Sequence, residues 1–420
     1  MLLFYNLSIW CYFFIIKIAS LFQDKAKLWL DGRKEVFSLL EKALANNNSS
    51  VIWMHCASLG EFEQGRPVLE QLRNEYPDHF LLLTFFSPSG YEIRKQYSEV
   101  DYVSYLPLDT ANNAKRFLEL VQPKLAIFVK YEFWYHYLTI LRQKSVPTVL
   151  ISAIFRKEQH FFKLWGGLFR EMLHCFHHVF VQDKVSEKLL NNIGMGEWMG
   201  KERSNVTRCG DTRVDQVLQI AKTNQLFPEI ETFVLNHKVM VCGSTWNKDE
   251  EIIAEWFQKA TTDWKLIVAP HDIQEQRLQD LEQRFDGQTI RSSRLNNNTS
   301  TGKRVLIIDN IGMLSSLYRY AYTAYVGGGF GRGIHNILEP AAYGIPILFG
   351  PKFWKFREAQ ILVEQKGAFV VGDLRALVRN LVKEGEYADS SRIVSQFMRE
   401  NEGATKVVMD FLSRLLEPES

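Results

Sequence analysis

The stretch GGGFGRGIHNILEPAAYGIPILFGP runs from Gly327 to Pro351 and directly follows the apolar segment TAYV. A strand that ends in glycines and leads into a helix is typical of a nucleotide-binding α/β unit, because glycines let backbone N–H groups approach an anion and a helix N-terminus attracts negative charge. We expect Asn336 to be the N-cap of a helix that starts near Ile337. Glu339, three residues after Asn336, either closes that helix start as in a capping box or binds ribose hydroxyls.

Outward from this stretch, apolar runs of strand length alternate with amphipathic runs of helix length. The expected strands are Val51–His55, Phe80–Thr84, Leu125–Val129, Thr148–Ile151, His178–Val181, Lys238–Cys242, Lys265–Val268, Arg304–Ile308, Ala324–Val326, Pro346–Phe349 and Ala368–Val371. The expected helices include Gly65–Glu75, Ala111–Leu120, Glu250–Ala260 and Ile273–Arg284, and Asn296–Lys303 is an expected loop tip. The alternation predicts an α/β protein of βαβ units with parallel sheets. Because the pattern weakens over residues 194–235, we expect two doubly wound halves joined near residues 215–235, with the active site in the cleft between them.

A second motif, HCASLGEFEQGRP (His55–Pro67), also leads from an expected strand into a helix. Gly60 relaxes the turn, and Glu61 stands at a junction where a doubly wound half faces its cleft. One interpretation is that the helix macrodipole simply favours an acidic residue in the first turn. The other is that Glu61 is a general base, because the same dipole keeps the carboxylate ionised, as a base requires.

The first 22 residues, MLLFYNLSIWCYFFIIKIASLF, are dominated by aliphatic and aromatic side chains, interrupted by Asn6, Ser8 and Lys17. This length approaches the ~20 residues that a helix needs to cross a bilayer. Basic residues follow at Lys25, Lys27, Arg33 and Lys34. We expect either a single membrane span or a helix that lies in the membrane interface, with the rest of the chain in the cytoplasm because basic flanks stay on that side.

The overall composition argues against several other classes of protein. With 420 residues, 46% hydrophobic and 23% charged, the chain is globular in composition and long enough for two domains. Its net charge of +2 gives no reason to expect a nucleic-acid partner. The five cysteines are odd in number and widely scattered, so we expect neither a disulfide framework nor a zinc site.

Both motifs resemble those of GT-B glycosyltransferases, and in particular of the 3-deoxy-D-manno-oct-2-ulosonic acid (Kdo) transferases of lipopolysaccharide assembly. That family has a glycine-rich turn, HN-x-LEPA and G-x-P-x-x-x-GP in one half, and S-V-G-E before a helix in the other. Further similar segments are SPSG (Ser87–Gly90), YLPLD (Tyr105–Asp109), KYEFW (Lys130–Trp134), CGDTRVDQ (Cys209–Gln216) and GSTWNKDEE (Gly243–Glu251). The chain departs from the family pattern at Ala269–His271, where the arginine before the histidine is missing, at Ile154, which stands in an arginine slot, and at Lys355.

The resemblance implies an inverting, metal-independent Kdo transferase with no cofactor, which moves Kdo from CMP-Kdo to a lipid A precursor (lipid IVA) at the cytoplasmic face of the inner membrane. It implies that Glu61 is the catalytic base and that Glu132 supports Glu61 or the acceptor pocket. The implied donor-binding residues are Arg213, Ser244, Thr245, His271, Gly327, Gly328, Gly329, Asn336 and Glu339, and the implied acceptor-side residues are Ser58, Gly60, Ser87 and Ser89.

We expect residues 1–24 to form the membrane anchor or interfacial helix, 25–220 an acceptor-binding Rossmann-like domain, 221–395 a nucleotide-sugar-binding Rossmann-like domain, and 396–420 a C-terminal helix that packs back on the first domain. Two other functions stay open: a GT-B enzyme that uses another nucleotide sugar with a lipid acceptor, and a non-catalytic nucleotide-binding scaffold at the membrane. The presence of Glu61 beside a complete donor motif favours an enzyme.

Overall fold

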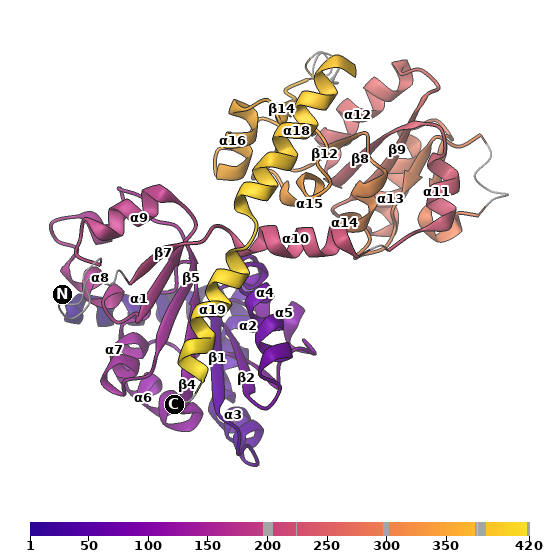
Figure 1. Cartoon of the computed structure of the whole chain (residues 1–420). Coiled ribbons are helices and arrows are strands. Elements are labelled where there is room, and N and C mark those ends of the chain that lie inside the picture. Colours follow the sequence, from indigo (N-terminus) through magenta and orange to yellow (C-terminus); the bar gives the residue numbers. More distant parts are fainter. Residues whose placement is uncertain (196–204, 224, 297–301, 374–375, 377–383, 418–420) are drawn as a thin grey trace. The chain divides into compact units, whose positions relative to one another are not determined.

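The computed structural model describes residues 1–195, 205–223, 225–296, 302–373, 376 and 384–417. The expected loop tip Asn296–Lys303 therefore lies mostly outside the described residues. The chain forms two compact units (Figure 1): unit 1 is made of Met1–Asp215 with Gly403–Ser420, and unit 2 of Gln216–Glu402. Each unit contains one sheet flanked by helices.

Unit 1 is built on a seven-stranded sheet in which all neighbouring strands are parallel. Its strands are β1 (Val51–Cys56), β2 (Phe80–Phe85), β3 (Tyr102–Tyr105), β4 (Pro123–Val129), β5 (Thr148–Ala153), β6 (His178–Val181) and β7 (Val206–Arg208), in the order β3-β2-β1-β4-β5-β6-β7. The expected strands of this half are confirmed as β1, β2, β4, β5 and β6, and β3 and β7 are additional edge strands. Central strands of a parallel sheet are buried on both faces, so their sequences are continuous apolar runs.

Helices cover the two faces of this sheet and complete two apolar layers. They are α2 (Asp24–Lys34), α3 (Val36–Leu44), α4 (Leu59–Glu75), α5 (Pro88–Arg94), α6 (Ala111–Val121), α7 (Tyr135–Gln143), η1 (His160–Phe162), α8 (Gly167–Leu173) and α9 (Lys184–Asn191). The next helix, α10 (Thr212–Lys222), contains the boundary between the units. Successive residues of β1 belong to opposite layers, since Trp53 clusters with Phe117 of α6 and Met54 clusters with Leu69 of α4.

The chain begins with helix α1 (Leu2–Ala19), most of whose residues are exposed. Among the described residues it is the one helix that is long and apolar enough to cross a membrane, with a mean hydropathy of 1.7. Ile9 packs with Trp29 of α2 and Leu108 in a small apolar cluster. The expected N-terminal apolar helix is therefore present, and it is attached to unit 1.

The last described helix, α19 (Ala404–Leu416), belongs to unit 1 although it follows all of unit 2 in the chain. Leu412 is fully buried in the same apolar cluster as Ile52 and Met54 of β1. The start of α19 is held by Asp215, whose carboxylate accepts the backbone N–H groups of Gly403 and Thr405, each at 2.6 Å. This packing covers one face of the unit 1 sheet.

Unit 2 is built on a second seven-stranded parallel sheet, in the order β10-β11-β9-β8-β12-β13-β14. Its strands are β8 (Lys238–Thr245), β9 (Trp264–Pro270), β10 (Thr289–Arg291), β11 (Val305–Ile307), β12 (Thr323–Val326), β13 (Ile347–Phe349) and β14 (Ala368–Val370). Its helices are α11 (Pro228–Val234), α12 (Asn247–Lys259), α13 (Glu275–Gln283), η2 (Ser292–Arg294), α14 (Leu314–Leu317), η3 (Tyr318–Tyr320), α15 (Leu338–Ala341), α16 (Arg357–Glu364) and α18 (Glu384–Asn401). The expected strands of this half are confirmed, and β10 is an additional edge strand.

Replacement of Leu412 by alanine should lower the free energy of unfolding of unit 1 by about 2–5 kcal/mol, because a fully buried side chain is lost and a cavity remains. Denaturant unfolding followed by tryptophan fluorescence measures the change. Val407→Ala, on the 39% exposed side chain of the same helix, is the matched control and should change stability by about 0.5 kcal/mol or less. Equal effects of the two substitutions would contradict the packing of α19 in unit 1.

Candidate active site

In each sheet the strand order reverses at one place, and ligands of doubly wound proteins bind beside the carboxyl ends of the strands at that place. In unit 1 the reversal lies between β1 and β4, and in unit 2 it lies between β8 and β12. The segments at or directly after the ends of these strands are Ala57–Glu61, Lys130–Trp134, Ser244–Trp246 and Gly327–Gly329. Both motifs that are expected to carry the chemistry therefore lie at the sheet edge where a ligand would bind.

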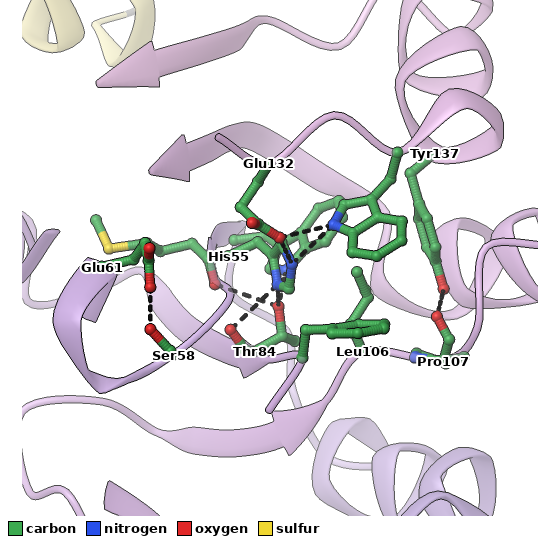
Figure 2. A network of polar contacts seen from close by, with 12 residues as sticks. His55, Ser58, Glu61, Thr84, Leu106, Pro107, Glu132 and Tyr137 are labelled. Carbon is green, nitrogen blue, oxygen red and sulfur yellow. Dashed lines mark hydrogen bonds and ion pairs between the residues drawn. The ribbon is translucent and has the colours of Figure 1, made fainter. Parts of the chain in front are cut away.

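Glu61 lies in the first turn of α4, directly after the end of β1. The hydroxyl of Ser58, the N-cap residue, donates a hydrogen bond to the Glu61 carboxylate (Figure 2). Glu61 is half-buried, and Gly60 beside it is exposed. Because the helix N-terminus stabilises negative charge, this arrangement presents an oriented carboxylate that a ligand can reach from solvent.

His55 at the end of β1 is fully buried and uses both of its ring nitrogens (Figure 2). Its Nδ1 lies 2.9 Å from the Thr84 hydroxyl oxygen, and its Nε2 lies 2.9 Å from a carboxylate oxygen of Glu132. The Trp134 indole N–H donates to the same Glu132 oxygen at 2.8 Å, and the Trp53 indole N–H donates to the Thr84 hydroxyl at 2.8 Å. This buried network joins β1, β2 and the segment after β4.

These contacts narrow the expected role of Glu132. Its carboxylate is buried and bound by His55 and Trp134. Within the part of the chain that the structure describes, Glu132 makes no hydrogen bond to Glu61. It can support Glu61 only indirectly, by holding His55 and with it the end of the strand that leads into α4.

Three other residues expected at the site, Ser87, Ser89 and Arg213, contact neighbours two residues away in the sequence. Ser87 is the N-cap residue of α5, and its hydroxyl oxygen accepts the Ser89 backbone N–H at 3.3 Å; the two hydroxyl oxygens are 3.0 Å apart. Arg213, expected to bind the donor, lies in unit 1 and pairs with Asp211 at 2.6 Å. Burial would raise the pKa of Asp211, but the Arg213 guanidinium outweighs it and lowers the pKa below its usual range. The charge of Arg213 is thus balanced locally.

The glycine turn after β12 is packed tightly against neighbouring backbone. A Cβ atom on Gly327 would lie 2.3 Å from the Ser244 carbonyl oxygen, and one on Gly329 would lie 2.5 Å from the Cα of Gly350. Gly328 has a φ of +92°, a conformation that favours glycine. The glycines are therefore required first of all because no side chain fits between these segments.

Two N–H groups of this turn are bound within the protein. The Gly328 N–H donates at 3.0 Å to the carboxylate of Asp249, which also accepts the Trp246 backbone N–H and the Tyr325 hydroxyl, each at 2.9 Å. The Gly327 N–H donates to a β8 carbonyl at 2.9 Å. Burial raises the pKa of Asp249. The expectation that the amides of Gly327 and Gly328 face a phosphate is thus not met, because the adjacent turn occupies them.

Ser244 and Thr245, both expected to bind the donor, form the end of β8. Ser244 is half-buried and has a φ of +53°, where the strand pairing is irregular. The Thr245 hydroxyl donates to Glu250 at 2.9 Å, and the same carboxylate pairs with Arg277. Thr245 therefore serves an internal contact, whereas Ser244 lies nearer the surface.

The helix after the glycine turn is shorter than the sequence suggests. The sequence predicts a helix from near Ile337 with Asn336 as its N-cap, but α15 (Leu338–Ala341) is a four-residue helix that starts at Leu338. Its N-cap residue is Ile337, not Asn336. The Asn336 side-chain oxygen accepts the Leu338 N–H at 3.1 Å, and the Asn336 amide donates to Glu339 at 3.2 Å. The Asn336 and Glu339 side chains thus bind each other at the start of this turn, and so short a helix contributes little dipole to bind an anion.

A pocket of about 560 Å³ opens beside this turn and is lined by Trp246, His271, Gly328, Gly331, Arg332, Gly333 and His335. The His271 ring stacks between Trp246 and His335, with ring centroids 4.5 and 4.7 Å apart. The Trp246 indole N–H donates to Nε2 of His335 at 3.2 Å, which requires that nitrogen to be unprotonated. Burial, helped by the neighbouring His271, lowers the pKa of His335. The positive charge of this pocket comes instead from Arg332, since a guanidinium keeps its charge in proteins.

The sequence pointed to His271 as a donor residue but did not single out Trp246, Arg332 or His335. Their positions do give a signal, because Trp246 closely follows an expected strand and Arg332 and His335 lie in the glycine-rich stretch. Their convergence, however, depends on segments from β8, β9 and β12 that are far apart in the chain.

Comparison with known proteins identifies the family. A family model described as "3-Deoxy-D-manno-octulosonic-acid transferase (kdotransferase)" matches residues 32–216. A 3-deoxy-D-manno-octulosonic acid transferase of Aquifex aeolicus (strain VF5) is 30% identical over 81% of this chain and 88% of the relative. The chain belongs to the Kdo transferase family. It is a glycosyltransferase of lipopolysaccharide biosynthesis. A transferase of the same name from Haemophilus influenzae is 27% identical over 87% of each chain.

Solved structures agree on the fold. The UDP-GlcNAc 2-epimerase of Neisseria meningitidis bound to UDP-GlcNAc aligns with a TM-score of 0.57 at 15% identity, over 87% of this chain and 100% of that one. A UDP-N-acetylglucosamine 2-epimerase from Listeria monocytogenes, described as putative, gives a TM-score of 0.58 at 12% identity, over 89% and 98%. The GT-B class with two Rossmann-like domains is thus confirmed.

The tight packing of the glycine turn predicts a sharp difference between two nearby glycines. Gly329→Ala should lower the stability of unit 2 by about 1–3 kcal/mol, because the new methyl group meets the Gly350 backbone. Gly331→Ala is the control, since its Cβ would approach only the Gly328 carbonyl oxygen at 3.5 Å. Thermal unfolding of the two variants measures the effect. A Gly329 variant as stable as the Gly331 variant would contradict the close packing of this turn.

Proposed function

We propose that this enzyme transfers Kdo from CMP-Kdo to a lipid A precursor such as lipid IVA, with inversion at the anomeric carbon and with Glu61 as the general base. The observation that carries the proposal is the position of Glu61. It lies at the N-terminus of α4, at the reversal point of the unit 1 sheet, half-buried and oriented by Ser58.

In the proposed reaction, an acceptor hydroxyl attacks the anomeric carbon of Kdo while its proton passes to the Glu61 carboxylate. The new bond joins the acceptor oxygen to that carbon. The bond from the carbon to the CMP phosphate oxygen breaks, and CMP leaves with the electron pair. A carboxylate at a helix N-terminus is kept ionised before the reaction, which suits a base. The Ser58 hydroxyl, as a hydrogen-bond donor to Glu61, holds the carboxylate in one orientation.

The donor is proposed to bind in the pocket beside the glycine turn of unit 2. Arg332 supplies positive charge to the leaving phosphate, and His271 and Ser244 contribute polar contacts. The exposed ring of Trp246, stacked on His271, offers an aromatic face to the cytosine base. Asn336 and Glu339 are proposed to hold the ribose hydroxyls. No metal ion is required in this scheme, because the phosphate charge is met by the protein.

The acceptor is proposed to reach unit 1 from the membrane at its cytoplasmic face. Helix α1 is apolar on its exposed surface and is attached to unit 1, the unit that carries Glu61. A lipid acceptor would then be bound by the same unit that holds the base. Ser58, Ser87 and Ser89 are the proposed polar contacts to its sugar head group.

Glu61→Gln should reduce the rate of Kdo transfer by at least about 100-fold, because the amide cannot accept the proton although it fills the same space. The assay measures CMP release and the mass of the lipid product with CMP-Kdo and lipid IVA. Glu63→Gln is the matched control on the same helix, where Glu63 is paired with Arg94 at 2.9 Å, and should retain transfer within a few-fold.

Circular dichroism and thermal unfolding of both variants show whether the fold is kept. Full transfer by a folded Glu61→Gln enzyme would remove Glu61 from its role. Turnover of UDP-sugars in place of CMP-Kdo would instead identify another GT-B specificity. Nucleotide binding without transfer to any lipid acceptor would indicate a non-catalytic protein.

Arg332→Ala should weaken CMP binding by about tenfold or more, because a charge-assisted contact to the phosphate is lost. Isothermal titration calorimetry with CMP gives the dissociation constant. Arg392→Ala is the control, since Arg392 lies on the surface of α18 with a side chain 63% exposed, and it should bind CMP as the unchanged protein does. Unchanged affinity in the Arg332 variant would place the phosphate elsewhere.

A further inference from the structure

Helix α1 is held against the rest of unit 1 by partly buried polar contacts as well as by apolar ones. The Tyr5 hydroxyl donates to the Asp109 carboxylate at 2.5 Å. The Asn6 side-chain oxygen lies 2.7 Å from Nε2 of His136. About two turns further on, the Tyr12 ring packs on Trp29 of α2 with ring centroids 5.8 Å apart. A helix that served only to anchor the chain in lipid would not need partners of this kind.

The Tyr5 contact completes the N-terminal cap of α7. The first N–H groups of a helix have no partner within the helix. Here Asp109 accepts the N–H groups of His136 and Tyr137, each at 3.2 Å, and the Tyr5 hydroxyl oxygen accepts the N–H of Tyr135 at 3.2 Å. Tyr5 therefore both binds the capping carboxylate and caps the first residue of α7 itself.

The start of α7 in turn sets the position of the residues just before it. Trp134 is the N-cap residue of α7 and donates its indole N–H to Glu132. The Trp134 ring also packs on Phe86 with ring centroids 4.5 Å apart. Glu132 contacts His55, the second-last residue of the strand that leads to Glu61. A continuous set of contacts thus connects α1 with the network shown in Figure 2.

We propose that Tyr5 is a positioning residue for the transferase reaction, which holds α7, Trp134 and Glu132 in their working arrangement through Asp109. The proposal rests on the proposed function for its effect on catalysis. It makes helix α1 a part of the active-site structure, although Tyr5 itself does not touch the reacting atoms.

The same contacts define how α1 meets the membrane. The side of α1 away from unit 1 exposes a row of apolar side chains: Leu3, Phe4, Leu7, Phe14, Ile15 and Ile18. If α1 crossed the bilayer, Tyr5 and Asn6 would have to leave Asp109 and His136 uncompensated. With those bonds kept, α1 lies along the membrane surface with its apolar row in the lipid. The positioning role therefore requires the in-plane arrangement.

Tyr5→Phe tests the positioning role, because it removes only the hydroxyl. In the full-length protein bound to phospholipid vesicles, kcat should fall about tenfold while KM for CMP-Kdo stays unchanged. Hydrogen exchange of the amides of residues 135–137 should become about tenfold faster. Tyr12→Phe on the same helix is the matched control and should change neither quantity, since no hydrogen bond of the Tyr12 hydroxyl is found among the described residues.

Unchanged exchange at residues 135–137 in Tyr5→Phe would overturn the capping contact. Faster exchange with unchanged kcat would overturn the positioning role. Hydrogen exchange needs no substrate, so it tests the contact even if the enzyme proves to use another donor or acceptor, an outcome that would count against the proposed function alone.

The in-plane arrangement is tested by spin-label depth in vesicles of phosphatidylethanolamine and phosphatidylglycerol. Labels are placed on the outward face at the native, exposed Cys11 and, in a Cys11→Ser background, at Leu7→Cys and Phe14→Cys. An in-plane helix gives nearly equal depths at the three sites. A spanning helix would place the labels at residues 7 and 14 about 10 Å apart in depth, and that result would overturn the proposal.

Discussion

His55 brings a polar ring into the interior of the unit 1 sheet, where both of its nitrogens need partners. Thr84 of β2 meets one nitrogen and Glu132, beyond β4, meets the other. Because Glu132 is thereby fixed against β1, the segment that follows β4 is held in place as far as Trp134. The turn with Glu61, the start of α7 and the contact with α1 all lie around this buried pair.

Unit 2 also has a buried carboxylate that makes a contact across the reversal point of its strand order. Asp249, just after β8, accepts the N–H of Gly328, just after β12. In each unit a buried acid therefore connects the two strands on either side of the reversal point. Glu132, after β4, contacts His55 of β1, and Asp249, after β8, binds Gly328, after β12. A buried carboxylate without these partners would destabilise the folded state, which favours the one arrangement in which both contacts form. Glu61 and Arg332, the residues proposed to contact the substrates, are more exposed than Glu132 and Asp249.

The sequence predicted most of the fold because the central strands are buried on both faces and are continuous apolar runs, as in β1 and β8. The edge strand β7 could not be recognised from such a run, since it has three residues and ends in the exposed Arg208. Local contacts such as that between Asn336 and Glu339 could be anticipated from their spacing. The contact between His55 and Glu132 joins residues 77 positions apart, and that between Tyr5 and Asp109 joins residues 104 apart. No local sequence pattern contains these two contacts, so they could be found only in the folded structure.

The return of α19 to unit 1 has a consequence for biosynthesis. All the strands of the first sheet leave the ribosome before unit 2 is made, yet the helix that covers one of their faces is translated after it. Until then the nascent sheet carries an uncovered apolar surface of the kind that chaperones bind. A chain interrupted anywhere before residue 404 cannot close this core. Helix α19 thereby makes closure of the first core depend on synthesis of the second unit, because the ribosome must translate unit 2 before this surface can be buried.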